Sequence, residues 1–290
     1  MLADLRRFWE ENGFLLLPRF FDEAALERVV SSVEETWRRR PRSVVVDDLV
    51  TSRRCRISEV SEQDRAHRFK LNDLYLEFQP LREVSLDPGL IALVQSLLGD
   101  APVLCNTLNL QQSSEQDCHS DSIYMTPETP GALVAAWIAL EPVRPDAGPL
   151  VYYPGSHRIP PFRFSGGHHA VDAEMPQWAD YIQGEIDRRG LSPELLNADT
   201  GDVFLWHGNL LHGARRIENP GSTRKSLVCH YLTLRDCRRR GYRMRREQSG
   251  YWIQRRPQPV TPLDRWLAAI DRRVFDRIRA LIFRLFPTKS

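Results

Sequence analysis

Short apolar segments separated by turn-forming residues restrict the fold of this chain more than any other feature. They are four to nine residues long and lie between Gly, Pro, Asn and Asp residues, at Val103–Leu110, Ala132–Leu140, Leu150–Tyr153, Asp202–Trp206 and Ser226–Leu232. Such spacing is typical of the strands of a sandwich or barrel. We therefore expect a mainly β fold whose core runs from about residue 103 to residue 234.

Helical patterns precede and interrupt this β region. Apolar residues recur at helical spacing in the first hundred residues, and Asp22 can cap one of the helices. The expected segments are the helices Ala3–Asn12, Glu23–Arg39 and Gly89–Leu98, the strand Phe14–Leu17, and a helical or irregular insertion at Pro176–Arg189 and Pro193–Leu196. We expect the N-terminal helices to flank the β core, which gives an α+β domain over residues 1–262.

The C-terminal part of the chain is strongly basic. From Arg235 to Ser290 there are 16 Lys and Arg residues against five Asp and Glu, whereas the whole chain has a net charge of +2. Residues 263–290 predict a basic amphipathic helix, which can dock on the domain, on a second subunit or on a membrane surface. The basic tail could contact one of three anionic partners: a lipid surface, a phosphorylated substrate or the acidic body of the protein itself.

The composition is that of a folded, soluble protein. Apolar residues make up 42% of the chain, and the five cysteines form no C-x-x-C pair, a pattern that favours reduced thiols in the cytoplasm over disulfides or a zinc site. No stretch approaches the roughly 18 apolar residues needed to cross a bilayer. We expect a cytoplasmic monomer or homodimer with peripheral membrane contact at most. No nucleic-acid partner is expected, because the body is acidic.

The segment H-S-D at 119–121 is the first candidate for chemistry. Residues i and i+2 of a strand point to the same side, so the imidazole and the carboxylate would converge there. With one distant histidine they form a 2-His-1-carboxylate site, which leaves three positions open at an iron(II) ion. His212 is the preferred third ligand. His207 and His230 are rivals, although ordinary hydrogen-bonded histidines would explain both.

An arginine follows the distal histidine at a useful distance. Arg224 comes twelve residues after His212, on the next predicted strand, and Ser226, two residues further on, would share its strand face. 2-Oxoglutarate chelates iron through its C1 carboxylate and 2-oxo group, so its C5 carboxylate needs a cationic partner. The planar guanidinium of an arginine binds a carboxylate through two parallel hydrogen bonds. Arg224 is therefore the expected anchor, and Ser226 could donate a further hydrogen bond.

These segments resemble the phytanoyl-CoA dioxygenase family of iron(II)/2-oxoglutarate enzymes. The resemblance runs from the opening F-W-E-E-N-G-F-L-L-L-P to about Leu234. Its motifs are H-S-D at 119–121, A-W-I-A-L-E at 136–141, G-P-L-V-Y-Y-P-G-S-H-R at 148–158, G-D-V-F-L-W-H-G-N-L-L-H-G-A at 201–214 and T-R-K-S-L-V-C-H-Y at 223–231. Each motif is modest by itself, but together and in this order they are specific.

The resemblance implies a double-stranded β-helix, a cupin-like jelly-roll that holds iron in its mouth. Carried over by position, the catalytic iron ligands are His119, Asp121 and His212, and Arg224 binds 2-oxoglutarate. Trp137 matches an aromatic residue of the cosubstrate pocket, although a core position would explain it equally well. The implied activity is hydroxylation with iron(II), 2-oxoglutarate and O2, which releases succinate and CO2; ascorbate is a candidate reductant.

The substrate is the least restricted part of the prediction. We expect a small organic molecule that is lipid-like, an acyl-CoA ester or a natural-product metabolite. Candidates for contacting it are Tyr124, Lys70, Arg68 and Arg158, and Gln111 is a further candidate for the cosubstrate pocket; each would also fit a surface or scaffold position. The alternatives are desaturation or epoxidation at the same iron, and a non-catalytic cupin-like protein that binds a metal or ligand.

Overall fold

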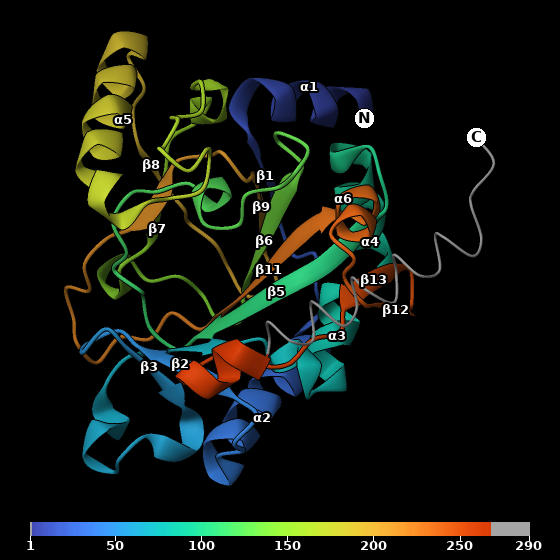
Figure 1. Ribbon diagram of the computed structural model, residues 1–290, viewed down its shortest axis with the longest axis vertical. Helices are drawn as coiled ribbons and strands as arrows, with labels where there is room; N and C mark the ends of the chain where they lie inside the picture. The colour runs from blue at the N-terminus through green and yellow to red at the C-terminus, as the bar shows by residue number, and fades with distance from the viewer. Residues whose placement is uncertain (1, 268–290) are drawn as a thin grey trace.

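Two mainly antiparallel sheets facing each other form the centre of the molecule. The computed structural model describes residues 2–267, and Figure 1 shows the long strands of the larger sheet side by side with helices around them. Within that range the larger sheet has ten strands and the smaller sheet three. This is the jelly-roll expected from the spacing of the apolar segments.

The larger sheet has the strand order β1-β9-β6-β11-β5-β4-β2-β3, and β13 pairs with β5 and with β12. Its central strands are buried along their whole length, because one face meets helices and the other meets the second sheet. The strands are β1 (Phe14–Leu17), β2 (Val45–Asp48), β3 (Arg53–Arg56), β4 (Phe69–Asn72), β5 (Pro102–Leu110), β6 (Leu133–Ala139), β9 (Val203–His207), β11 (Ser226–Thr233), β12 (Met244–Glu247) and β13 (Gly250–Ile253).

The smaller sheet consists of β7 (Leu150–Tyr152), β8 (Glu194–Leu195) and β10 (His212–Ala214), in the order β10-β7-β8. Apolar side chains from both sheets meet between them; Trp137, Phe204 and Tyr152 belong to this inner cluster. Since side chains alternate along a strand, neighbouring residues of β11 face opposite sides. Leu227 packs toward the helices, whereas Val228 faces the interior between the sheets.

Most of the helices cover the outer face and the ends of the larger sheet, whereas residues 175–189 pack on a separate apolar cluster with Ile123, Ile159 and Leu211. The helices are α1 (Leu2–Asn12), α2 (Glu23–Arg39), α3 (Gln79–Ser85), α4 (Pro88–Leu98), α5 (Met175–Arg189) and α6 (Leu234–Arg239). The carboxylate of Asp22 caps α2 by accepting a hydrogen bond from the amide of Ala25, as its position before the apolar stripe predicted. Leu26, Val29 and Val33 on the buried side of α2 belong to the same apolar cluster as Leu227.

Three features differ from the sequence prediction. The strands β2, β3 and β4 extend the larger sheet well before residue 103, and β12 and β13 extend it after residue 234. Residues 194 and 195 form the edge strand β8, not a helical or irregular segment, because their backbone pairs with β7. The H-S-D segment is not a regular strand: His119 makes an isolated bridge to His212, and Asp121 begins a short 3-10 helix.

The basic amphipathic helix expected over residues 263–290 falls mainly outside the described residues. Residues 262–267 have helical backbone, and Asp264 forms an ion pair with Arg56 at 2.7 Å, which joins this segment to β3. No helix within residues 2–267 is long and apolar enough to cross a membrane.

Candidate metal centre

Backbone pairing brings two distant histidines together. The amide of His119 donates to the carbonyl of His212 at 2.8 Å, and the amide of His212 donates back to the carbonyl of His119 at 2.9 Å. The bridge allows no side chain at the next position of β10, because a Cβ on Gly213 would lie 2.9 Å from the carbonyl oxygen of Gln116. A glycine after the distal histidine therefore permits this close approach.

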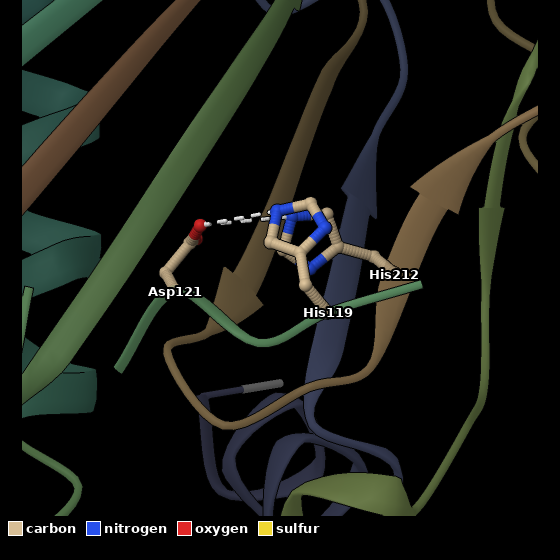
Figure 2. A group of neighbouring side chains, drawn as sticks. All are labelled: His119, Asp121 and His212. Atoms are coloured by element: carbon tan, nitrogen blue, oxygen red, sulfur yellow. Dashed lines mark ion pairs between the residues drawn. The ribbon is translucent and has the colours of Figure 1, made fainter. Parts of the chain in front are cut away.

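Figure 2 shows the side chains of His119, Asp121 and His212 pointing toward one another. Their candidate ligand atoms lie within 4.8 Å of one another. Oδ1 of Asp121 is 3.8 Å from Nε2 of His119 and 3.7 Å from Nε2 of His212. Two ligands about 2.1 Å from one ion at a right angle are roughly 3 Å apart, so each imidazole would need to move less than about 1 Å closer to the carboxylate to share one ion with it.

Hydrogen bonds behind the three side chains leave the correct atoms free. Nδ1 of His119 is 2.8 Å from the carbonyl oxygen of Asp117, and Nδ1 of His212 is 3.0 Å from that of Leu210. A carbonyl oxygen can only accept, so both Nδ1 atoms carry hydrogen and both Nε2 lone pairs remain available. The indole Nε1 of Trp206 donates to Oδ2 of Asp121 at 2.7 Å, which leaves Oδ1 for a metal.

The protonation states also suit a cation. Burial raises the pKa of Asp121, but the nearby His212, His230 and His119 outweigh that effect and hold it well below its usual range. Burial and the neighbouring His212 lower the pKa of His119 to about 4. At neutral pH this site therefore offers an ionised carboxylate and a neutral imidazole, the forms that bind a metal.

Arg224 is buried in the same cavity. The cavity has a volume of about 1000 Å³, and its lining includes the three candidate ligands together with Arg224 and Trp137. The guanidinium donates to the carbonyl of Gly148 at 3.0 Å, its Nε atom has no partner, and it forms no ion pair among the described residues. Burial lowers the pKa of Arg224 to about 10. A buried cation without a counterion favours an anionic ligand.

Comparison with known proteins identifies the family. The model of the phytanoyl-CoA dioxygenase family matches residues 9–226. The chain belongs to this family. The human peroxisomal phytanoyl-CoA dioxygenase is 24% identical to it over 249 residues, which cover 82% of this chain and 70% of the human protein. A probable phytanoyl-CoA dioxygenase of Caenorhabditis elegans is 24% identical over 255 residues, which cover 81% of this chain and 77% of the worm protein.

Solved structures with the same fold agree with this membership. The epimerase SnoN from nogalamycin biosynthesis has a TM-score of 0.61 and 18% identity, and the match covers 90% of this chain and 95% of that one. EctD from S. alaskensis, solved with 2-oxoglutarate and 5-hydroxyectoine, has a TM-score of 0.57 and 14% identity, with 90% and 83% covered. The phytanoyl-CoA dioxygenase family member described here is an iron(II)- and 2-oxoglutarate-dependent dioxygenase that uses O2.

Some of the other predicted site residues of this dioxygenase lie in the cavity. Trp137, Lys70 and Tyr124 line it. The guanidinium of Arg224 lies 5.9 Å from the centre of the Trp137 ring. The ring of Tyr124 lies 5.9 Å from that of His119, and its side chain is 45% exposed, so it stands at the open side of the site.

Other predicted residues lie elsewhere in the dioxygenase. Ser226 and Gln111 line a separate small pocket on the side of α2, and the Ser226 hydroxyl has no hydrogen-bond partner among the described residues. The shared strand face expected for Arg224 and Ser226 does not arise, because Arg224 precedes β11 and is not part of its alternation. Arg158 is exposed beside Gly155, and Arg68 pairs with Glu115 at 2.6 Å; neither lines the cavity.

The rival histidines have different surroundings. His207 lies beside His157, with 5.3 Å between the ring centres, and does not line the cavity. His230 does line it, and its Nε2 is 3.4 Å from Oδ2 of Asp121. His230 therefore lies beside the candidate ligands, although it does not belong to the group of three described residues that could hold one metal ion. The sequence does not predict the hydrogen bond from Trp206 to Asp121, because a tryptophan in an apolar strand gives no signal of a polar contact.

Proposed function

We propose that this dioxygenase holds iron(II) with His119, Asp121 and His212 and binds the C5 carboxylate of 2-oxoglutarate with Arg224. The proposal further assigns it the hydroxylation of a small organic substrate, with release of succinate and CO2. The observation that carries the proposal is the buried guanidinium of Arg224. It shares a cavity with the three candidate ligands and has no ion-pair partner among the described residues.

The chain itself contributes orientation and exclusion of water. Iron(II), when bound with 2-oxoglutarate and O2, supplies the oxidising power that inserts oxygen into a C–H bond as the keto acid loses CO2. Trp206 fixes the Asp121 carboxylate, and the carbonyl partners of the two imidazoles fix their rings. The buried face of Trp137 beside Arg224 keeps water from the expected carboxylate position, which strengthens the charge-assisted hydrogen bonds there.

Anaerobic reconstitution tests the proposal directly. Iron(II) and 2-oxoglutarate added to the full chain should give a weak visible charge-transfer band, and Arg224→Ala should abolish it at moderate cosubstrate concentrations while iron binding is retained. In air, the wild type should release succinate slowly without substrate and faster with a true substrate. A band of unchanged intensity in Arg224→Ala would contradict the role of Arg224. Metal binding without any succinate release would favour a non-catalytic cupin-like protein.

We also propose that residues 263–290 follow the catalytic domain at 1–262 as a basic amphipathic helix that makes peripheral contact with a membrane. At its start Leu263 and Trp266 are 62% and 60% exposed, and the sequence of this segment is basic. The measurement is cosedimentation of the full chain with vesicles of neutral lipid, with or without anionic lipid. Binding to neither kind of vesicle would refute the membrane contact.

A further inference from the structure

The cavity of the metal centre is lined by an excess of cations. Five cationic side chains line it, whereas Asp121 is the one acidic residue among its described lining residues; the cations are Arg54, Lys70, Arg224, Arg240 and Arg255. In the proposed function, the charges of iron(II), 2-oxoglutarate, Asp121 and Arg224 cancel. The four other cations are therefore not needed to balance the metal or the cosubstrate.

The acidic partners of these cations stand behind the cavity wall. Asp47 contacts Arg54 at 2.5 Å and Lys70 at 3.3 Å, and Asp73 contacts Arg255 at 2.6 Å. Neither aspartate lines the cavity, and Asp73 is almost fully buried. The carboxylates thus orient the cationic groups from behind, and the wall presents hydrogen-bond donors to the interior.

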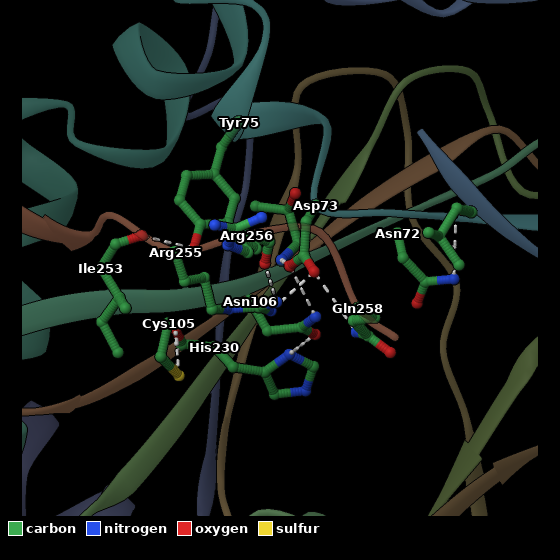
Figure 3. A network of polar contacts seen from close by, with 12 residues as sticks. Asn72, Asp73, Tyr75, Cys105, Asn106, His230, Ile253, Arg255, Arg256 and Gln258 are labelled. Atoms are coloured by element: carbon green, nitrogen blue, oxygen red, sulfur yellow. Dashed lines mark hydrogen bonds and ion pairs between the residues drawn. The ribbon is translucent and has the colours of Figure 1, made fainter. Parts of the chain in front are cut away.

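Two amide side chains add donors to the same wall. Nδ2 of Asn72 donates to Asp47 at 3.2 Å and Nε2 of Gln258 donates to Asp73 at 3.3 Å, and both residues line the cavity. Figure 3 shows Asp73 among Asn106, Arg255 and Gln258, with His230 on the far side of Asn106. These contacts connect the C-terminal segment to the wall of the cavity.

This wall is remote from the anchor expected for the cosubstrate. Arg224 precedes β11, whereas Asn106, which contacts Asp73, lies opposite His230 further along that strand. The four residue steps from Ser226 to His230 span about 13 Å of extended strand. One carboxylate cannot bridge that separation, so Arg255 and Arg224 serve different anionic groups.

We propose that Arg54 and Arg255, which Asp47 and Asp73 hold in the cavity wall, bind an anionic group of the substrate, a carboxylate or a phosphate, that is separate from the group bound by Arg224. This inference rests on the proposed function and adds the substrate class to it. The cavity of about 1000 Å³ is large enough for a small-molecule substrate beside the cosubstrate. Apolar side chains such as Leu108, Val228 and Leu232 line the space between, so the substrate is an anion with an apolar body.

The family match ends at residue 226, before Arg255 and Gln258. The C-terminal part of the wall therefore comes from a segment outside the range that the family model matches. It pairs in parallel with β5 through Tyr251 and Trp252, which fixes Arg255 relative to the metal centre.

Matched probes test the inference. Octanoate, octyl phosphate and the neutral 1-octanol are titrated calorimetrically into the full chain with iron(II) and excess 2-oxoglutarate, without oxygen. We expect at least one anion to bind about tenfold or more tightly than 1-octanol, because charge-assisted hydrogen bonds to a guanidinium have no counterpart in the alcohol. The tighter binding of octanoate or of octyl phosphate would show whether the site prefers a carboxylate or a phosphate.

Substitutions locate the binding group. Arg255→Gln and Arg54→Gln should each weaken binding of the preferred anion about fivefold or more. Arg56→Gln is the matched control, because Arg56 lies on the same strand as Arg54, pairs with Asp264 and does not line the cavity. The Arg54 side chain is 43% exposed, so its removal leaves a folded protein even if the loss of Arg255 beside buried Asp73 does not.

Equal binding of the alcohol and the anions, anion binding unchanged in both variants, or no anion binding at millimolar concentration would each overturn the inference. The proposed function is judged separately by the charge-transfer band with iron(II) and 2-oxoglutarate. Calorimetry on the protein without iron decides the anion site even where that band is missing, so the two failures are distinguishable.

Discussion

Trp206→Phe removes one hydrogen bond from the metal centre and keeps an aromatic ring in place. Trp206 is 2% exposed, and its Nε1 donates to Oδ2 of Asp121 at 2.7 Å. Its ring lies 4.7 Å from that of His212 and 5.8 Å from that of Phe204, so a phenyl ring still fills most of the space. The main loss is the restraint on the carboxylate.

The size of the effect follows from the nature of this contact. A hydrogen bond to a charged group contributes roughly 1.5–3 kcal/mol, and loss of a partner behind a metal ligand typically lowers metal affinity about 10- to 100-fold. Without the indole, Oδ2 of Asp121 keeps only the nearby Nε2 of His230 at 3.4 Å, and the carboxylate can turn toward it. We expect Trp206→Phe to bind iron(II) more weakly. The affinity of each iron-loaded site for 2-oxoglutarate should change little.

The assay is an anaerobic iron(II) titration against a competing chelator. Trp137→Phe is the control, because Trp137 is equally buried and its Nε1 has no partner among the described residues. That variant should keep the iron affinity of the wild type. An iron affinity of Trp206→Phe within twofold of the wild type, or an equal loss in Trp137→Phe, would refute the reasoning.

Three further predictions concern single positions. Gly213→Val places a side chain against the carbonyl of Gln116, so the bridge to His119 should open and iron affinity should fall at least tenfold, measured by the same titration; unchanged affinity would count against the bridge. Burial and the neighbouring His157 lower the pKa of His207 from 6.5 to about 4, so the stability that depends on its neutral form is complete above pH 6.5 and lost as the pH falls toward 4. Acidification should therefore reduce the free energy of unfolding by about 3 kcal/mol more in the wild type than in His207→Gln, as measured by thermal unfolding over this pH range. Equal losses in the two proteins would contradict the prediction. Ser226→Ala should leave the KM for 2-oxoglutarate within twofold, since that hydroxyl lies outside the cavity; a large rise would show that it reaches the cosubstrate.

The sequence predicted the long strands well because burial on both faces leaves a continuous apolar run. The expected segments at 103–110, 132–140 and 226–232 differ from β5, β6 and β11 by one residue at one or both ends. The strands β2, β3 and β4 were missed because V-V-D-D, R-R-C-R and F-K-L-N mix charge with apolar residues over four positions. They are strands because β4 pairs with β5, β2 with β4 and β3 with β2, and such pairing is not visible in local composition.

The same reason separates the site residues found from those missed. H-x-D spacing, a distal H-G and a following arginine are local patterns, and they led to the residues that the structure brings together around one cavity. The contacts of Trp206, Asn106 and Arg255 depend on register and on a C-terminal strand outside the resemblance. For Ser226 the local pattern was misleading. Side-chain alternation predicted that Ser226 and Arg224 share a face, but β11 begins at Ser226, so Arg224 lies before the strand.

The parallel pairing of β13 with β5 has a practical consequence for protein fragments. A fragment cut at residue 234, where the resemblance stops, would keep β11 but lack the strand that covers the edge of β5 at Val103 and Leu104. It would expose unpaired amide and carbonyl groups beside an apolar surface, a known cause of aggregation. Such a truncation is expected to be poorly soluble even though every candidate iron ligand is present in it.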